Sequence, residues 1–580
     1  MRVLSDCSLP SSPLRLLLRR PLFLIILVGL LAMGGALNAD FYMDDYAFIL
    51  NSKGDAPNEF CWQFLGQRYG SKSFDAMGIS VFQLIPTTLT LLSNWLFPLN
   101  PAAAHVWNLL IHLTLAVLVF RLGKRLLQRL GLLDSPAARS QAAFIGAMIF
   151  ACHPLGTEPV HYAKCHMVQL VALFSFWATC AAVDFLAVPS RRNGGRCLLL
   201  TGLCVISYFP GTVLLGFNLA ALLLFTLTGK GKDQLRKVLP AAATLRKPGM
   251  IAALIFGSVT GLAVLSYFLQ VYYARVSSWG ELYPVHIVTQ GRVFWEYVQR
   301  IFVTAHLASD HYQPWSTFRD TGAVLRLAGF ALLMAGAMVA TFRNGNATRR
   351  SLGLLLLFVL IPFAMRMLYM NIEILVEYRA YHALPWVGLL AGCGLTALAA
   401  RLYPSKLRWL PAAGLITCFT LLSAQRGVVW RSGTSLAQNV LQQYPLNNRA
   451  RTQLQSFDLD AGNYGAVLRR HEEILSVRDQ INTRNQQQAG RIIVDPMRAD
   501  SNVIGSYQFV ILARAELEGC LKALAFADHS IASLKTLIPG QFKAKPGETV
   551  TGAWPLMEAR ATVERALAAG YGTPSLPKME

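Results

Sequence analysis

The stretch PLFLIILVGLLAMGGALNADFYMDDYAFIL, residues 21–50, joins an apolar run to an acidic and aromatic segment. Residues 21–37 carry no charged side chain, and a helix of that length can cross most of a hydrocarbon core about 30 Å thick. Three arginines between positions 15 and 20 precede the run. By the positive-inside rule the N-terminus is then cytoplasmic, and Asp44 and Asp45 emerge on the opposite face.

The composition is that of a membrane protein. Of 580 residues, 54% are apolar and 14% are charged, against about a quarter charged in an ordinary soluble domain. The formal charge of +22 would suit nucleic acid binding in a soluble protein, but here the Lys and Arg residues gather in alternate loops, as membrane insertion requires. We therefore expect a lipid bilayer as partner and no nucleic acid. Most of the ten cysteines lie in or beside apolar runs and are expected to be buried thiols.

The hydropathy pattern predicts an all-α integral membrane protein with about eleven crossings. They are expected near residues 21–37, 102–122, 141–153, 166–188, 197–210, 211–228, 250–270, 322–341, 352–370, 384–401 and 408–425. We interpret the first run as a retained anchor and not a cleaved signal, because cleavage near Ala39 would release the acidic segment from the membrane.

Two further segments should not cross. Residues 80–98, within the outer loop 38–101, are interrupted by Pro86 and Asn94 and should lie in the interface, and a short helix is expected near 292–307.

The predicted organisation has three parts. A cytoplasmic N-terminus, residues 1–20, leads into a transmembrane domain, residues 21–425. An odd number of crossings places residues 426–580 on the face that holds the aspartates. This last part has apolar positions at helical spacing and resembles one or two degenerate tetratricopeptide (TPR) units. It could hold an acceptor protein or cap the membrane domain.

Three outer segments accompany the acidic one: CHPLGTEPVHYAKCH at 152–166, AHLASDHYQPW at 305–315 and MLYMNIEILVEYRAYHALPW at 367–386. Ionisable residues near membrane depth usually face a cavity and serve a site. Each cluster alone could instead lie at a helix end, where its charges reach water. Four clusters on one face favour a shared outer cavity. A carboxylate there could take a proton from an attacking hydroxyl while cations stabilise a departing phosphate, which suits group transfer from a phosphate-linked donor.

The same residues resemble a family, the multispanning glycosyltransferases of the C type (GT-C), and in particular the transmembrane and tetratricopeptide-repeat O-mannosyltransferases with their bacterial relatives. FYMDDYAFI is similar to the family's Phe-x-x-Asp-Asp segment, and LNPAAAHVWNLLIH, through His105, Asn108 and His112, to its second span. HPLGTEPV is similar to its His-Pro-x-x-Thr-Glu-x-Val element, and VEYRAYH to its Glu-x-Arg-x-Tyr element.

The resemblance implies an enzyme that moves a sugar from a polyprenyl-phosphate donor to a protein or glycan hydroxyl, with inversion. It assigns the catalytic base to Asp44 or Asp45, and we expect Asp44 first. The location implied is the bacterial inner membrane, with the site facing the periplasm. The chain departs from the family at His166, where relatives often have Arg, and at YFPG, residues 208–211, where they have a Lys-Glu pair. Because His cannot reproduce the guanidinium fork, mannose is not carried over as the donor sugar.

The expected site combines these assignments. The donor phosphate should be bound by Arg379, Lys164, His166 and Arg366, and the substrate cavity should be lined by His153, Glu158, Tyr162, Glu377, Tyr381, Asp310 and His311. No metal site is assigned, although His311 and Asp310 could bind a divalent cation together with Asp44. Two other classes stay open: a transporter or flippase of lipid-linked sugars, and a noncatalytic membrane scaffold.

Overall fold

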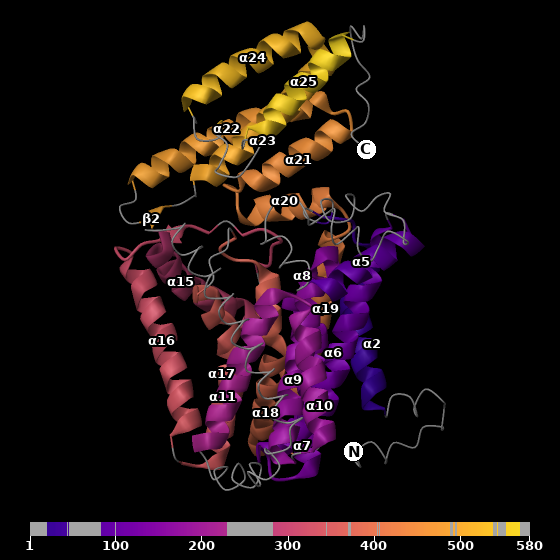
Figure 1. Ribbon diagram of the computed structural model, residues 1–580, viewed down its shortest axis with the longest axis vertical. Coiled ribbons are helices and arrows are strands. Elements are labelled where there is room, and N and C mark those ends of the chain that lie inside the picture. Colours follow the sequence, from indigo (N-terminus) through magenta and orange to yellow (C-terminus); the bar gives the residue numbers. More distant parts are fainter. Residues whose placement is uncertain are drawn as a thin grey trace, which may run out of the picture.

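The structure is a computed structural model. It describes residues 20–42, 45, 83–98, 100–188, 190–228, 282–304, 306–311, 313–343, 345–368, 373–402, 404, 407–487, 491–492, 496–537, 542 and 553–568. Nearly all of these residues form helices, in a long bundle with a group of further helices over one end (Figure 1). One short antiparallel pair, β1 (Trp315–Ser316) with β2 (Arg491–Ile492), links an outer loop of the bundle to that group.

Seven helical stretches in the described residues are long and apolar enough to cross a membrane. They are α2 with η2 (Pro21–Met33, Gly34–Asn38), α6 (Pro101–Arg129), η7 with α9 (Ala163–Cys165, His166–Ala187), α16 (Thr321–Phe342), α17 (Ala347–Leu368), α18 (Leu384–Leu402) and α19 (Leu410–Val429). Helices α7 (Pro136–Cys152), α10 (Arg191–Val205) and α11 (Phe209–Thr228) lie in the same bundle (Figure 1). The helical membrane fold is thus confirmed. The count of eleven crossings stays a prediction, and the span expected at 250–270 lies outside the described residues.

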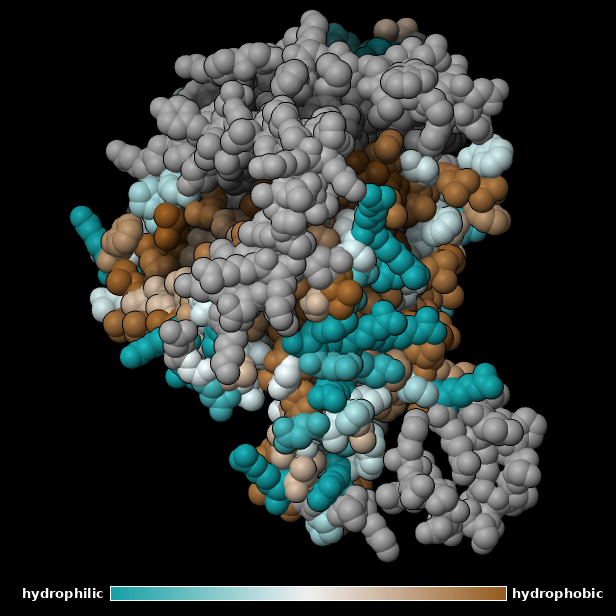
Figure 2. Space-filling model, turned by 60° about the horizontal axis from the view of Figure 1, so that its bottom comes forward, coloured by the Kyte–Doolittle hydropathy of each residue, from teal (hydrophilic) through white to brown (hydrophobic). Residues whose placement is uncertain are grey.

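One end of the bundle, which we call the basic end, carries arginines on many of its helices. Arg129 ends α6, Arg191 begins α10, Arg343 follows α16, and Arg349 lies in the first turn of α17. These four side chains are exposed. Figure 2, with this end turned forward, shows hydrophilic side chains gathered here beside hydrophobic flanks. The apolar flanks include Leu325 and Leu332 of α16, which are 67% and 74% exposed, as lipid-facing residues would be.

Helices α7 and α18 approach so closely that their backbones touch. A Cβ added at Gly392 would lie 2.1 Å from the carbonyl oxygen of Ala142, and one at Gly388 would lie 2.5 Å from that of Gly146. Small residues allow such an approach, and packing of this kind is what holds helices together in a bilayer, where no hydrophobic driving force acts between them. This contact fixes the centre of the bundle and positions the chain that follows α7 and precedes α18.

Two helices near the opposite end correspond to the segments that were expected not to span, although the second begins at Leu282 and ends at Phe302 and not near 292 and 307. Helix α5 (Leu84–Leu96) is short and amphipathic, and Trp95, Leu96 and the following Phe97 are at least half exposed. Helix α15 (Leu282–Phe302) is amphipathic and is not among the candidate spans. In Figure 1 both lie near the end of the bundle that faces the C-terminal helices.

The C-terminal part comprises helices α20 (Gly433–Gln443), α21 (Asn448–Asp460), α22 (Tyr464–Gln487), α23 (Pro496–Glu518), α24 (Cys520–Leu537) and α25 (Trp554–Ala568). Consecutive helices contact one another along this series, and Ile474, Ile504 and Ile511 belong to a core separate from that of the bundle. Gly462, between α21 and α22, has a φ of +73°, which suits glycine. Helices α20 and α21 lie directly over the loops of the bundle (Figure 1).

Candidate functional site

Asp45 is fully buried and joins Tyr42 to the 3-10 turn η7 (Ala163–Cys165), which precedes α9. Its carboxylate accepts hydrogen bonds from three backbone amides: those of Tyr42 (3.1 Å), Ala163 (3.2 Å) and Lys164 (2.7 Å). Burial raises the pKa of Asp45 to about 7, although these amides oppose the shift. Both carboxylate oxygens are therefore occupied by backbone donors. Asp44, the first-choice base, lies outside the described residues.

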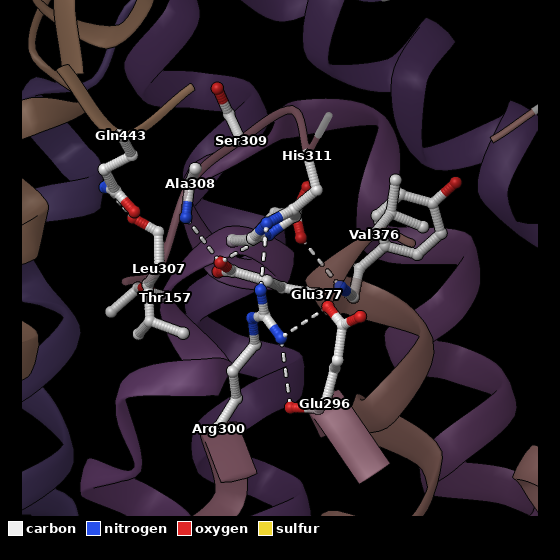
Figure 3. A network of polar contacts seen from close by, with 12 residues as sticks. Thr157, Glu296, Arg300, Leu307, Ala308, Ser309, His311, Val376, Glu377 and Gln443 are labelled. Atoms are coloured by element: carbon white, nitrogen blue, oxygen red, sulfur yellow. Dashed lines mark hydrogen bonds and ion pairs between the residues drawn. The ribbon is translucent and has the colours of Figure 1, made fainter. Parts of the chain in front are cut away.

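A second fully buried carboxylate, Glu377, lies at the centre of a polar network (Figure 3). It begins the 3-10 turn η8 (Glu377–His382), just before α18. One oxygen accepts from the amide of Ala308 (2.6 Å) and from Nε2 of His311 (3.0 Å), and the other accepts from Arg426 Nη2 (2.9 Å). Burial alone would raise the pKa of Glu377, but these cationic and hydrogen-bonding partners outweigh it and hold the pKa below its usual range.

Glu158 is a third buried carboxyl group, and its electrostatic situation is the opposite. It lies in the short helix α8 (Thr157–His161) and accepts one hydrogen bond from the backbone amide of Tyr378 (2.7 Å). Burial and the nearby charge of Glu377 raise its pKa well above the usual range. The surroundings of Glu158 thus favour its neutral form, whereas those of Glu377 favour its ionised form. Carboxyl pairs whose pKa values are pushed apart in this way can divide donor and acceptor roles between them.

His311 connects Glu377 to the C-terminal helices. Its side chain is fully buried, and burial lowers its pKa, which keeps the imidazole neutral. Nε2–H donates to Glu377, so Nδ1 accepts from the hydroxyl of Tyr444 (2.8 Å), which follows α20. The carboxylate of the neighbouring Asp310 has other partners. Its Oδ2 accepts a hydrogen bond from Asn447 Nδ2 (3.3 Å) and lies 3.9 Å from Arg449 Nη1. The two side chains therefore do not share a partner.

The arginines expected to bind phosphate lie close to one another. Arg379 is 4% exposed, donates to the backbone carbonyl of Glu373 and pairs with its carboxylate at 3.6 Å. His286 donates to the carbonyl of Arg366 (2.8 Å). Its pKa is lowered to about 4, mainly by burial and further by the charges of Arg379 and Arg366. Both guanidinium groups thus act on the same imidazole, and one carboxylate, that of Glu373, faces Arg379.

Other expected site residues have internal partners. His153 binds the carbonyl of Ile301 (3.1 Å), and its second ring nitrogen accepts from the amide of Leu155 (3.2 Å). His166 contacts the carbonyl oxygens of Ala163 (2.6 Å) and Pro86 (2.9 Å), which ties α9 to α5. Both ring nitrogens of His166 thus already face carbonyl oxygens, and a phosphate contact would have to displace one of them.

Tyr162 and Tyr381 are also buried. Tyr162 lies in an aromatic cluster with Tyr42 and Trp430, at ring distances of 6.0 and 6.3 Å. Tyr381 bonds to His112 on α6 through its hydroxyl group (2.8 Å). The backbone amide of Lys164 donates a hydrogen bond to Asp45, and the side chain of Lys164 is partly exposed. These residues therefore join the site to the bundle.

The four segments singled out in the sequence do converge. Tyr42 precedes Asp45 and accepts a hydrogen bond from Ser309 (3.2 Å), the neighbour of Ala308, which donates to Glu377. Glu158 reaches the backbone of Tyr378. The roles expected for these side chains stay predictions, because Asp44 lies outside the described residues.

The sequence analysis missed Arg426, although a signal was present. Arg426 lies in the last turn of α19, at the end of the bundle opposite the basic end, where the positive-inside rule disfavours a cation. Besides Glu377 it binds Thr157 Oγ1 (3.0 Å) and the carbonyl of Leu307, so it joins three of the four segments. Tyr444 and Arg449 were missed because nothing in the helical tail indicates which of its residues face the membrane domain.

No group of three or more His, Cys, Asp or Glu side chains arranged to hold a metal ion is found within the described part of the chain. The cation site considered for His311 and Asp310 would need Asp44, which lies outside that part. The side chains of the first two point to different partners.

No protein-family model matches the chain, and no curated protein matches it significantly. Among solved structures, the crystal structure of ArnT from Cupriavidus metallidurans bound to undecaprenyl phosphate is similar, at 13% identity and a TM-score of 0.36, over 93% of this chain and 84% of that one. A TM-score this low does not establish a common fold, so neither family nor activity is assigned from it.

Proposed function

We propose that the protein is an inverting glycosyltransferase of the GT-C type, which transfers a sugar from a polyprenyl-phosphate donor to an acceptor hydroxyl on the extracytoplasmic face. The acceptor oxygen attacks the anomeric carbon as the bond from that carbon to the phosphate oxygen breaks. The phosphate leaves with the bonding electron pair, and the acceptor proton passes to a carboxylate base. One base suffices, because inversion needs no covalent sugar intermediate.

The observation that carries this proposal is the convergence of buried acids and cations at one end of an apolar helical bundle. Asp45, Glu158 and Glu377 come from three segments more than 100 residues apart and are each at most 2% exposed. Burying several ionisable groups is expensive unless they are paired, and such clusters in membrane proteins mark sites of function. A noncatalytic scaffold would not need them.

The donor phosphate is assigned to Arg379 and Arg366, with Lys164 beside the acidic segment. Two neighbouring guanidinium groups can bind the donor phosphodiester, which is a monoanion, and stabilise the dianion formed when the phosphate leaves, through several charge-assisted hydrogen bonds. The polyprenyl chain would lie along the lipid-facing flanks. Helix α5, with exposed Trp95 and Phe97, lies at the same end of the bundle and could contact it.

The base is assigned to Asp44 and not to Asp45. Both oxygens of Asp45 accept backbone hydrogen bonds, and its side chain is inaccessible. We interpret Asp45 as an anchor that joins the backbone of Tyr42 to that of Ala163 and Lys164. A transporter is disfavoured because the buried charges gather at one end of the bundle, whereas transporters bind their substrates near mid-membrane.

The test is transfer from a set of radiolabelled polyprenyl-phosphate sugars by purified full-length protein. Asp44→Asn should lower transfer by at least about a hundredfold, as loss of a general base does, with donor binding retained. The matched control is Asp134→Asn, an exposed aspartate between α6 and α7 at the basic end. Equal transfer by the two variants would overturn the base assignment. The absence of transfer from every donor by the wild type would overturn the function.

A further inference from the structure

A cavity of about 300 Å³ lies between the end of α15, the loop that follows it and α20. Its lining includes Glu296, Gln299, Arg300, Gln313, Gln443 and Tyr444. Gln299 and His306, also in the lining, are exposed at its rim, whereas Arg300 is only 6% exposed. The cavity adjoins the Glu377 network, because Arg300 contacts His311 (Figure 3), and Tyr444 also contacts His311.

The lining is polar but nearly balanced in charge. The carboxylate of Glu296 pairs with Arg292 and, at 3.4 Å, with Arg300, and Gln313 donates to it as well. Arg292 also donates to Oε1 of Gln313 (2.9 Å), which fixes that amide. The remaining groups are amides, an imidazole and a phenol. Such a wall offers donors and acceptors in similar number and suits a neutral ligand with several hydroxyl groups.

Two polar atoms of the lining residues have no hydrogen-bond partner within the described part of the chain. They are Oε1 of Gln443, an acceptor, and Nε of Arg300, a donor, and both are buried. Gln443 is held in place because its Nε2 donates to the carbonyl of Leu307 (2.8 Å). An unsatisfied buried polar atom costs about 1–3 kcal/mol. Both atoms belong to side chains that line the cavity, so a rotation that turned either atom toward the cavity would let a ligand hydroxyl satisfy it.

We propose that this cavity binds the acceptor, and that the acceptor is a neutral sugar unit of a glycan. The inference rests on the proposed glycosyl transfer and names its acceptor. The cavity volume is at the lower end of the range for small-molecule sites, about 300–1,000 Å³, which suits a single sugar unit. Its lining residues lie in helices and a loop, with neither the strand edge nor the apolar side-chain pockets by which extended peptides are usually bound.

The geometry also gives the C-terminal part a role. Gln443 ends α20 and Tyr444 follows it, so the cavity is incomplete without them. The hydroxyl of Tyr444 donates to His311, which donates to Glu377. A sugar that contacts Tyr444 is thereby coupled through two hydrogen bonds to the buried carboxylate, and we interpret His311 as a positioning residue for the acceptor.

The experiment is saturation-transfer difference NMR on the full-length protein in nanodiscs. The probes are the methyl glycosides of glucose, mannose, galactose and N-acetylglucosamine. At least one should bind saturably, and Gln443→Ala should weaken it about tenfold, the equivalent of one hydrogen bond of about 1.4 kcal/mol. The control, Gln442→Ala, alters the preceding and exposed residue of the same helix and should leave binding unchanged. Should Gln443→Ala not fold, the rim variant Gln299→Ala should still weaken binding about threefold.

The outcomes separate the two proposals. Sugar binding that depends on Gln443, together with no transfer from any donor, would leave the cavity assignment standing and remove the proposed function. Transfer without binding of any methyl glycoside, or with equal binding by the Gln443 and Gln442 variants, would overturn the cavity assignment. Binding of the peptide acetyl-Ala-Thr-Ala-amide instead of the sugars, and in a manner dependent on Gln443, would also overturn it, in favour of a protein acceptor.

Discussion

The contact between Arg426 and Glu377 gives a quantitative test of the site. Arg426 is 8% exposed, and its side chain binds Glu377, Thr157 and the carbonyl of Leu307. Replacing it with Met keeps most of the volume but leaves the Glu377 carboxylate buried with two neutral donors, Ala308 N–H and His311. Removing one partner of a buried ion pair destabilises a protein by about 3–5 kcal/mol, because the other charge stays desolvated.

The double variant Arg426→Met/Glu377→Gln separates charge from packing. Glutamine can still accept from Ala308, and no uncompensated charge remains. We expect each single variant to lose about 3–5 kcal/mol and the double variant about 1–3 kcal/mol, since replacing both members of a buried pair is often nearly neutral. The coupling free energy should therefore be several kcal/mol, well beyond the ~0.5 kcal/mol within which independent sites add.

The assay is unfolding of the purified protein in mixed dodecylmaltoside and SDS micelles, followed by tryptophan fluorescence at several pH values. In Arg426→Met the pKa of Glu377 should rise above its unfolded value, so the loss of stability should shrink as the pH falls and Glu377 takes up a proton. Additive single effects at pH 7, or a loss that does not diminish at low pH, would refute the assignment of Glu377 as an ionised group held by Arg426.

Three other predictions follow from described contacts. Gly392→Ala should destabilise the bundle by about 2–3 kcal/mol, because its Cβ would meet a backbone carbonyl of α7. The control is Gly394→Ala on the same helix, where a Cβ meets nothing within 4 Å. This variant should be neutral or stabilising in the same unfolding assay. The pKa of Asp45 is about 7 in the folded protein, against 3.8 for an ordinary aspartate in the unfolded chain. Between these pH values the folded protein binds one proton more than the unfolded chain. The free energy of unfolding of the wild type should therefore fall as the pH rises from about 4 to 7. The difference in this slope between wild type and Asp45→Asn should be measurable by denaturant titration across that range, and identical slopes would contradict it. Arg379→Gln should raise the KM for the polyprenyl-phosphate donor about tenfold or more. Arg379→Lys should have an intermediate KM, because lysine keeps the charge but lacks the planar guanidinium fork. An unchanged KM in both variants would remove Arg379 from the phosphate site.

The local properties of this chain follow from the sequence because each depends on residues that are neighbours along it. Apolar runs of about 20 residues specify helices that a bilayer can hold, so most of the expected spans appear as helices within a few residues of their predicted bounds. The break near residues 206–208 and the short helix at 84–96 were likewise indicated, by SYFPGT and by the polar interruptions of the outer segment. The basic loops indicated which helix ends lie together.

Only the tertiary structure decided which side chains meet. The sequence marked Asp45, Glu158 and Glu377 as members of one cluster. It could not show that Asp45 accepts from three backbone amides, or that the pKa values of Glu158 and Glu377 are shifted in opposite directions. Those properties arise from burial and from partners far away in the chain, such as Arg426 beside Glu377. A pKa or a hydrogen bond depends on distances of a few ångströms, which helix packing sets and which periodicity along a single helix cannot specify.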